Sequence, residues 1–118
     1  MRVFFKYWLP VLLWAVFIFL VSSLPGKDIP SLFWGQDILF HIFEYAVLAL
    51  FLSRALKNSR FFSLSDKPMR LSLVIITCLV YALSDELHQY FVPGRISCIS
   101  DLMIDGIGLI LGSAIYRW

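Results

Sequence analysis

Hydrophobic positions along the chain gather into four long runs, separated by shorter polar stretches. Each run approaches the ~20 residues that an α-helix needs to cross the hydrocarbon core of a bilayer. The pattern therefore predicts an all-α membrane protein, a bundle of four transmembrane helices at about residues 7–23, 37–56, 71–90 and 99–116. No internal repeat or low-complexity segment is visible, so we expect residues 1–118 to form a single domain.

The composition of the chain supports a membrane location. Of its 118 residues, 60% are hydrophobic and 17% are aromatic, and the mean hydropathy is +0.83. A soluble domain of this size buries only ~60–70% of its chain surface, which is too little to hide so much apolar area. The first run has features of a signal peptide, but Pro25 and the lack of a small-residue cleavage site favour a retained helix.

Basic residues are distributed unevenly between the two sides of the predicted bundle. Eight of the ten Lys and Arg residues fall on the side that holds both ends of the chain, and only Lys27 and Arg95 fall on the other. The positive-inside rule makes the richer side cytoplasmic, so we expect both the N and C termini in the cytoplasm. The net charge of only +2 argues against a nucleic-acid partner.

Ionisable and polar residues concentrate in the halves of the helices that face away from the cytoplasm. An acidic side chain at the middle of a bilayer costs ~2.5–3.5 kcal/mol on insertion scales, so several together must pair, face a wet cavity or bind a ligand. The candidate ligand-binding cluster at this depth consists of His41, Glu44, Tyr45, Asp85, Glu86, Gln89, Arg95, Asp101 and Asp105.

Helical spacing assigns several of these residues to faces. Asp37, His41 and Glu44 stand at i, i+4 and i+7, on one side of the second helix. In the third helix Asp85 and Glu86 are neighbours about 100° apart around the axis. We therefore do not expect both to enter one small pocket, and we expect Glu86 to face elsewhere.

One narrow stripe of the fourth helix combines two acids with two small residues. Asp101 and Asp105 are followed by Gly108 and Gly112, at i, i+4, i+7 and i+11. Two glycines four residues apart let another helix approach closely, so we assign Gly108 and Gly112 to helix packing. If the glycines face the bundle, both aspartates face it too.

Some of the polar residues also have simpler structural explanations. Asp37 and Asp101 can stabilise helix N-termini through the free amides and the helix dipole. His41 can hydrogen-bond a neighbouring helix, and His88 can lie wetted at the membrane surface. Arg95 can fold back over the acids as their counter-charge, because a guanidinium group binds carboxylates and phosphates in a fork.

Ligand types for a divalent metal ion are present at His41, Glu44, Asp85 and Asp105. However, no short motif such as H-E-x-x-H occurs, and these ligands would have to come from three helices. We therefore expect no metal site and no cofactor.

The motif of the third and fourth helices resembles the VanZ-like family. It consists of the run SDELHQYFVPGR at residues 84–95, followed by the stripe of two aspartates and two glycines. The D-x-x-x-H-x-x-E-Y segment at residues 37–45 and the S-S-x-P-G end of the first helix agree with it. The resemblance covers nearly the whole chain. This sequence departs from it at Ile38, where the family often has Lys, and Asp105 is Asn in many members.

The resemblance implies a multi-pass protein of the bacterial cytoplasmic (inner) membrane. The founding member of the family is associated with low-level resistance to the glycopeptide teicoplanin. The resemblance thus implies a topology, a set of motif positions and a link to the cell envelope, but no reaction.

We therefore expect a protein that binds a polar lipid head group, or a lipid-linked cell-envelope precursor, at the outer leaflet. Arg95 would meet a phosphate, and the carboxylates would meet amines. Two alternatives remain open. One is a membrane enzyme that acts on a lipid-linked substrate with Glu44 or Asp85 as base. The other is a small proton-coupled transporter, which would need a homo-oligomer to form a pathway.

Overall fold

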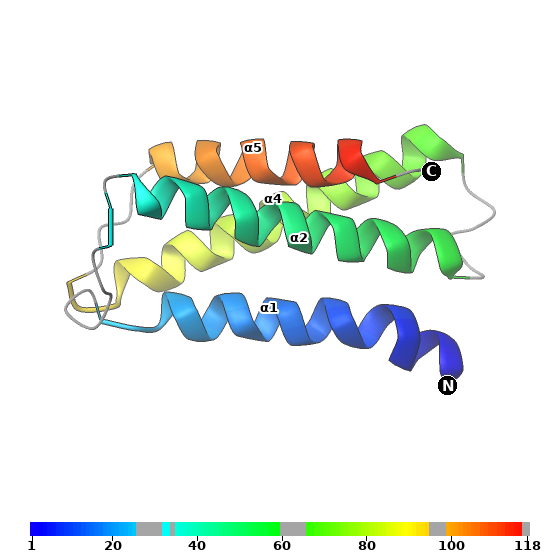
Figure 1. The fold of residues 1–118 in the computed structure, drawn as a ribbon, viewed down its shortest axis with the longest axis horizontal. Coiled ribbons are helices and arrows are strands. Elements are labelled where there is room, and N and C mark those ends of the chain that lie inside the picture. The colour runs from blue at the N-terminus through cyan, green and yellow to red at the C-terminus, as the bar shows by residue number, and fades with distance from the viewer. Residues whose placement is uncertain (26–31, 34, 60–65, 95–98, 117–118) are drawn as a thin grey trace.

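The computed structural model is a bundle of helices that run side by side along its long axis, in a body of 46 × 27 × 24 Å (Figure 1). The structure describes residues 1–25, 32–33, 35–59, 66–94 and 99–116. Within these ranges the chain forms one π-helical turn and four α-helices, and it forms no strand. The elements are η1 (Phe4–Trp8), α1 (Leu9–Ser22), α2 (Gln36–Asn58), α4 (Lys67–Tyr90) and α5 (Ile99–Ile115). The prediction of an all-α chain is confirmed for this part.

Three of these helical segments are long and apolar enough to cross a membrane. They are Phe4–Ser22, which joins η1 to α1, and the helices α2 and α4. Helix α5 forms as predicted but has only 17 residues, or about 25 Å of length at 1.5 Å per residue. That is shorter than the ~30 Å hydrocarbon core, so a fourth membrane span and the orientation of the termini stay predictions.

The first helix begins earlier than its apolar run and contains a wide turn. Leu9 donates its backbone N–H to the carbonyl of Phe4, five residues back, which is the hydrogen bond of a π-helix. Pro10 follows directly. Proline has no N–H and its ring crowds the carbonyl four residues before it, so a wider turn at this point accommodates the ring without ending the helix.

Helix α4 begins four residues before the predicted start at Leu71. The carboxylate of Asp66 accepts a hydrogen bond from the backbone N–H of Met69 at 3.0 Å and so caps the helix. Pro68 stands in the first turn, where its missing N–H costs nothing. The polar first turn carries no apolar period, which is why hydropathy alone places the start too late.

The closest helix pair is α2 and α5, which make the most extensive contact in the bundle. A Cβ atom added to Gly108 would lie well inside van der Waals distance of the Ile42 carbonyl oxygen, and one added to Gly112 would do the same at Ala46. The two backbones therefore touch directly, which only glycine permits. This contact brings the acids of α5 against the polar face of α2.

Helix α1 packs against α4 and against the side of α2 that faces away from α5 (Figure 1). The indole Nε1–H of Trp14 donates to the backbone carbonyl of Glu44 at 2.8 Å, and the hydroxyl of Tyr81 donates to the carbonyl of Ala15. Both bonds satisfy a polar group on an aromatic ring that would otherwise be unpaired in an apolar environment.

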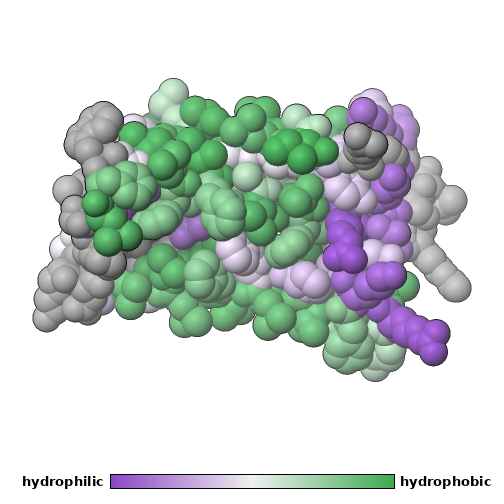
Figure 2. Space-filling view, viewed as in Figure 1, coloured by the Kyte–Doolittle hydropathy of each residue, from purple (hydrophilic) through white to green (hydrophobic). Residues whose placement is uncertain are grey.

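The outer surface is apolar over most of its length. Figure 2 shows hydrophobic side chains covering the middle of the bundle and hydrophilic side chains gathered at the end where the N-terminus lies. Many large apolar residues point outward, including Leu13, Val80 and Ile110, which are 61%, 64% and 58% exposed. An apolar belt of this extent matches a lipid-facing surface and not a wetted one.

A polar site inside the bundle

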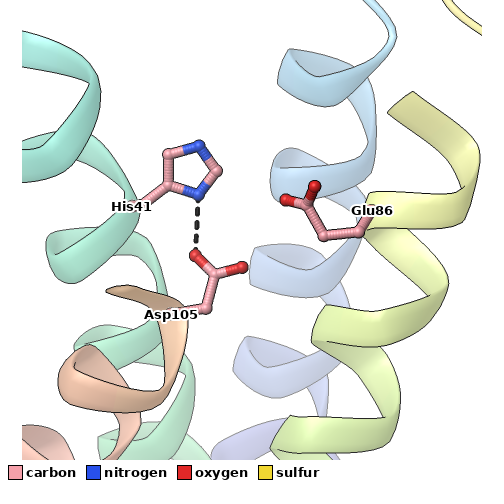
Figure 3. Close-up of side chains that lie close together, drawn as sticks. All are labelled: His41, Glu86 and Asp105. Atoms are coloured by element: carbon pink, nitrogen blue, oxygen red, sulfur yellow. Dashed lines mark hydrogen bonds and ion pairs between the residues drawn. The ribbon is translucent and has the colours of Figure 1, made fainter. Parts of the chain in front are cut away.

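His41 and Asp105 form the centre of a polar site enclosed by α2, α4 and α5. The imidazole Nδ1 of His41 lies 2.7 Å from Oδ1 of Asp105 (Figure 3). The Asp105 side chain is fully buried, and that of His41 is 15% exposed. The two residues are 64 positions apart and meet because the glycine face of α5 lies directly against α2.

Glu86 of α4 also belongs to this site. Its carboxyl group points toward the His41–Asp105 pair in Figure 3. One nitrogen of His41 and one carboxylate oxygen each of Glu86 and Asp105 all lie within 4.8 Å of one another. The prediction that Glu86 faces elsewhere is therefore wrong. Helix α4 contacts α2 and α5 as well as α1, so adjacent positions about 100° apart on it both face protein.

Asp85 and Tyr45 form a second buried pair. The Tyr45 hydroxyl donates a hydrogen bond to Oδ2 of Asp85 at 3.1 Å, and these residues are 0% and 4% exposed. Asp85 and Glu86 are thus both interior: Asp85 accepts from Tyr45, and Glu86 lies beside the His41–Asp105 pair. Sequence spacing placed Tyr45 next to the polar face of α2 without indicating which acid it would contact.

Two carboxylate oxygens of the site accept no hydrogen bond from any residue that the structure describes: Oδ1 of Asp85 and Oδ2 of Asp105. A buried acceptor without a donor costs about 1–3 kcal/mol, and more when it is charged. These oxygens can therefore accept a hydrogen bond from a group outside the described residues, such as an ammonium group or water, or they can bind a cation.

Glu44 and Asp101 stand at the margin of the site. Both are partly exposed, and both lie near enough to His41 to add to the negative potential at its ring. Asp101 occupies the first turn of α5. Asp37 is exposed in the first turn of α2, where it fits the simpler role at a helix N-terminus.

Gln89, although buried, is directed to α1. Its amide Nε2 donates to the hydroxyl of Ser22 at 3.3 Å, and both side chains are buried. The partner Ser22 was not singled out for this contact, although the small residues that end the first helix are a signal for close approach.

His88 binds α1 as well, so it is not simply wetted at the surface. Its ring stacks on Phe19 with centroids 4.4 Å apart, and its Nε2 lies 2.8 Å from the Ser23 hydroxyl. That hydroxyl donates its only hydrogen to the Phe19 carbonyl, so His88 is the donor to Ser23. Together Gln89 and His88 tie the end of α4 to the end of α1. Arg95 lies outside the described residues.

A family model described as VanZ/LLP1 matches residues 5–118, which is nearly the whole chain. The chain belongs to the VanZ/LLP1 family. The resemblance read from the sequence is thereby confirmed, and with the three apolar helical segments it identifies a membrane protein of this family. No curated protein and no solved structure gives a significant match.

Proposed function

We propose that this VanZ/LLP1-family protein binds the polar head group of a lipid, or of a lipid-linked envelope precursor, at the outer leaflet of the bacterial inner membrane. In this proposal all four helices cross the membrane and both termini are cytoplasmic. The 17 residues of α5 reach the lower limit for a span, and a bilayer thins locally around a short helix.

Contacts at one end of the bundle support this orientation. The Arg54 guanidinium, near the end of α2, lies 4.9 Å from the ring centroid of Tyr7 in η1. The Lys57 ammonium lies 5.7 Å from the ring of Tyr116, just beyond α5. Arg54 and Lys57 thus share one end of the bundle with η1 and Tyr116, whereas the first turns of α2, which carry His41, lie toward the other end (Figure 1). The positive-inside rule makes the basic end cytoplasmic.

The observation that carries the proposal is the pair of buried carboxylate oxygens on Asp85 and Asp105 that lack a donor among the described residues. Burying such charge inside an apolar bundle is costly unless a ligand compensates it. An ammonium group has three N–H donors and a positive charge, so an amine on a head group or on a lipid-linked precursor satisfies both needs. Arg95, by its place in the sequence between α4 and α5, supplies the partner for a phosphate of the same ligand.

Binding to the reconstituted protein tests the proposal. Wild type, Asp85→Asn and Arg95→Ala are placed in nanodiscs and titrated with an amine-bearing phospholipid, an anionic phospholipid without an amine, and a lipid-linked precursor. Asp85→Asn keeps an acceptor for Tyr45 but removes the charge, so we expect about tenfold weaker binding of the amine ligands, or about 1.4 kcal/mol. Arg95→Ala weakens binding of every phosphate-bearing ligand.

The exposed Asp37 provides the matched control, because Asp37→Asn removes an equal charge outside the site. Affinity that is the same in all four proteins would overturn the proposal. If the ligand is a lipid-linked precursor, cells that express the wild type should also tolerate more teicoplanin than cells that express Asp85→Asn.

The His41–Asp105 pair favours one second candidate, an enzyme that acts on a lipid-linked substrate. A carboxylate that holds an imidazole ring 2.7 Å away is the arrangement that orients a histidine for general acid–base catalysis. Cells that carry His41→Ala should then accumulate an identifiable lipid species. A lipid profile identical to that of the wild type would count against catalysis while leaving head-group binding intact.

A further inference from the structure

Three side chains of the polar site have the donor types of a metal centre. His41 contributes an imidazole nitrogen from α2, and Glu86 and Asp105 contribute carboxylate oxygens from α4 and α5. One donor atom of each lies within 4.8 Å of the other two. Because the ligands come from three helices far apart in the sequence, no motif with short spacing could have indicated them.

A second, independent observation points to a ligand at this place. Oδ2 of Asp105 accepts no hydrogen bond from the described residues, although the side chain is fully buried. In Figure 3 the Asp105 carboxyl group lies with one oxygen on His41 and the other on the side of Glu86. An oxygen buried in this position is available to an ion held by all three side chains.

We propose that His41, Glu86 and Asp105 bind a divalent transition-metal ion, with Zn²⁺ as the best fit. The two carboxylates balance the charge of a divalent ion, so the filled site is neutral inside an apolar bundle. One nitrogen and two oxygens form a three-ligand set that leaves a fourth position for water or a substrate oxygen, as in catalytic zinc sites. An imidazole ligand favours Zn²⁺ over Mg²⁺ and Ca²⁺, which prefer oxygen alone.

Completing the coordination requires movement of the side chains. Bonds of 2.0–2.2 Å in a tetrahedron put the donor atoms ~3.3 Å apart. Nδ1 of His41 must leave Oδ1 of Asp105, which lies 2.7 Å away, so that the ion is held by Nδ1 and by Oδ2. The Glu86 carboxylate must move inward by rotation of its side chain. The hydrogen bond between Nδ1 and Oδ1 is broken when the ion binds, and its proton leaves to water whichever of the two atoms carries it, so that both carboxylates are ionised and the imidazole is neutral.

This site is a different one from the metal site weighed on the sequence alone. The ligand types noted in the sequence include Glu44 and Asp85, whereas the structure brings Glu86 to the His41–Asp105 pair. The inference does not rest on head-group binding. Metal binding is measured without added lipid-linked ligand, and lipid binding is measured in the chelator-treated protein, so either can fail while the other holds.

Metal titration of the untagged, purified protein tests the inference. After chelator treatment and desalting, Zn²⁺, Mn²⁺, Mg²⁺ and Ca²⁺ are each titrated in competition with a chromophoric chelator. We expect one Zn²⁺ per chain and weaker or no binding of Mg²⁺ and Ca²⁺. His41→Ala, Glu86→Gln and Asp105→Asn should each weaken Zn²⁺ binding by more than the ~10–100-fold that loss of an outer-shell partner costs.

Two variants control for adventitious binding. His88→Ala removes the other histidine, which is bonded to Ser23 and lies outside the ligand set, and Asp37→Asn removes an exposed acid from the same helix as His41. Both should bind Zn²⁺ like the wild type. Equal loss in His88→Ala, or equal binding in all three ligand variants, would overturn the inference.

Cobalt substitution keeps the test valid if a ligand variant fails to fold, because it uses the wild type. Co²⁺ bound by one nitrogen and two protein oxygens should give visible d–d absorption bands of four- or five-coordinate geometry, and Zn²⁺ should abolish them at one equivalent. A spectrum of fully hydrated Co²⁺, or no ion retained after desalting, would contradict the site.

Discussion

At the scale of single residues, the polar site depends on neutral donors as well as on charges. The Tyr45 hydroxyl donates to one oxygen of Asp85, while the other oxygen has no donor among the described residues. Both residues are almost completely inaccessible, so water cannot readily replace the hydroxyl. The bond therefore supports a carboxylate that the bundle can otherwise accommodate only with difficulty.

Tyr45→Phe should destabilise the protein because it leaves the buried Asp85 carboxylate without its hydroxyl donor. The expected cost is about 1–3 kcal/mol, seen as a lower thermal midpoint in detergent by scanning fluorimetry. Tyr90→Phe is the control, because Tyr90 is 73% exposed. Equal midpoints for the two variants would show that the bond makes no net contribution.

At the scale of elements, direct contact between α2 and α5 determines the geometry of the site. Each glycine of α5 in this contact faces a backbone carbonyl of α2 with no room for a side chain. One turn toward the start of α5, the same stripe presents Asp105 to His41. The packing motif and the polar motif are thus consecutive parts of a single helix face.

Gly112→Ala should separate the two helices, because its Cβ would overlap the Ala46 carbonyl oxygen. We expect a loss of about 1–3 kcal/mol in stability. Gly106→Ala is the matched control on the same helix, since a Cβ there meets nothing within 4 Å. It should be neutral or stabilise by up to ~1 kcal/mol through helix propensity. If the Gly112→Ala protein were as stable as the Gly106→Ala protein, the close contact between α2 and α5 would be contradicted.

At the scale of the whole molecule, the bundle has a basic end and a polar interior near the other end. An apolar surface joins the two, and the described helices α2 and α4 are long enough to cross a bilayer. His41 is a partly exposed member of the site, and the membrane surface nearest to it is the one at the end away from Arg54 and Lys57. The function of the site therefore depends on which side of the membrane that surface faces.

Cysteine labelling in intact cells decides the orientation. In a background with Cys78→Ala and Cys98→Ala, Phe91→Cys reports the end near the polar site and Lys67→Cys reports the basic end, both at exposed positions. A membrane-impermeant maleimide should label Phe91→Cys in intact cells and Lys67→Cys only after permeabilisation. The reverse pattern would place the polar site on the cytoplasmic side.

The sequence by itself determined the all-helical fold, the apolar surface and the family. These are local or compositional properties, because hydropathy and spacing depend on near neighbours along the chain. The early start of α4 at Lys67, capped by Asp66, shows the limit of this reasoning at a boundary, because the cap and not hydropathy sets where the helix begins.

Only the tertiary structure decided which polar residues meet. Spacing predicts that residues share a face, but the rotation of each helix relative to its neighbours comes from packing. Glu86 faces the interior because α4 has neighbouring helices on more than one side. Gln89 hydrogen-bonds Ser22 because α1 packs against that side of α4. The His41–Asp105 contact exists because two glycines of α5 let the backbones of α2 and α5 touch. That close approach depends on both helices together, so the sequence of one helix alone does not predict it.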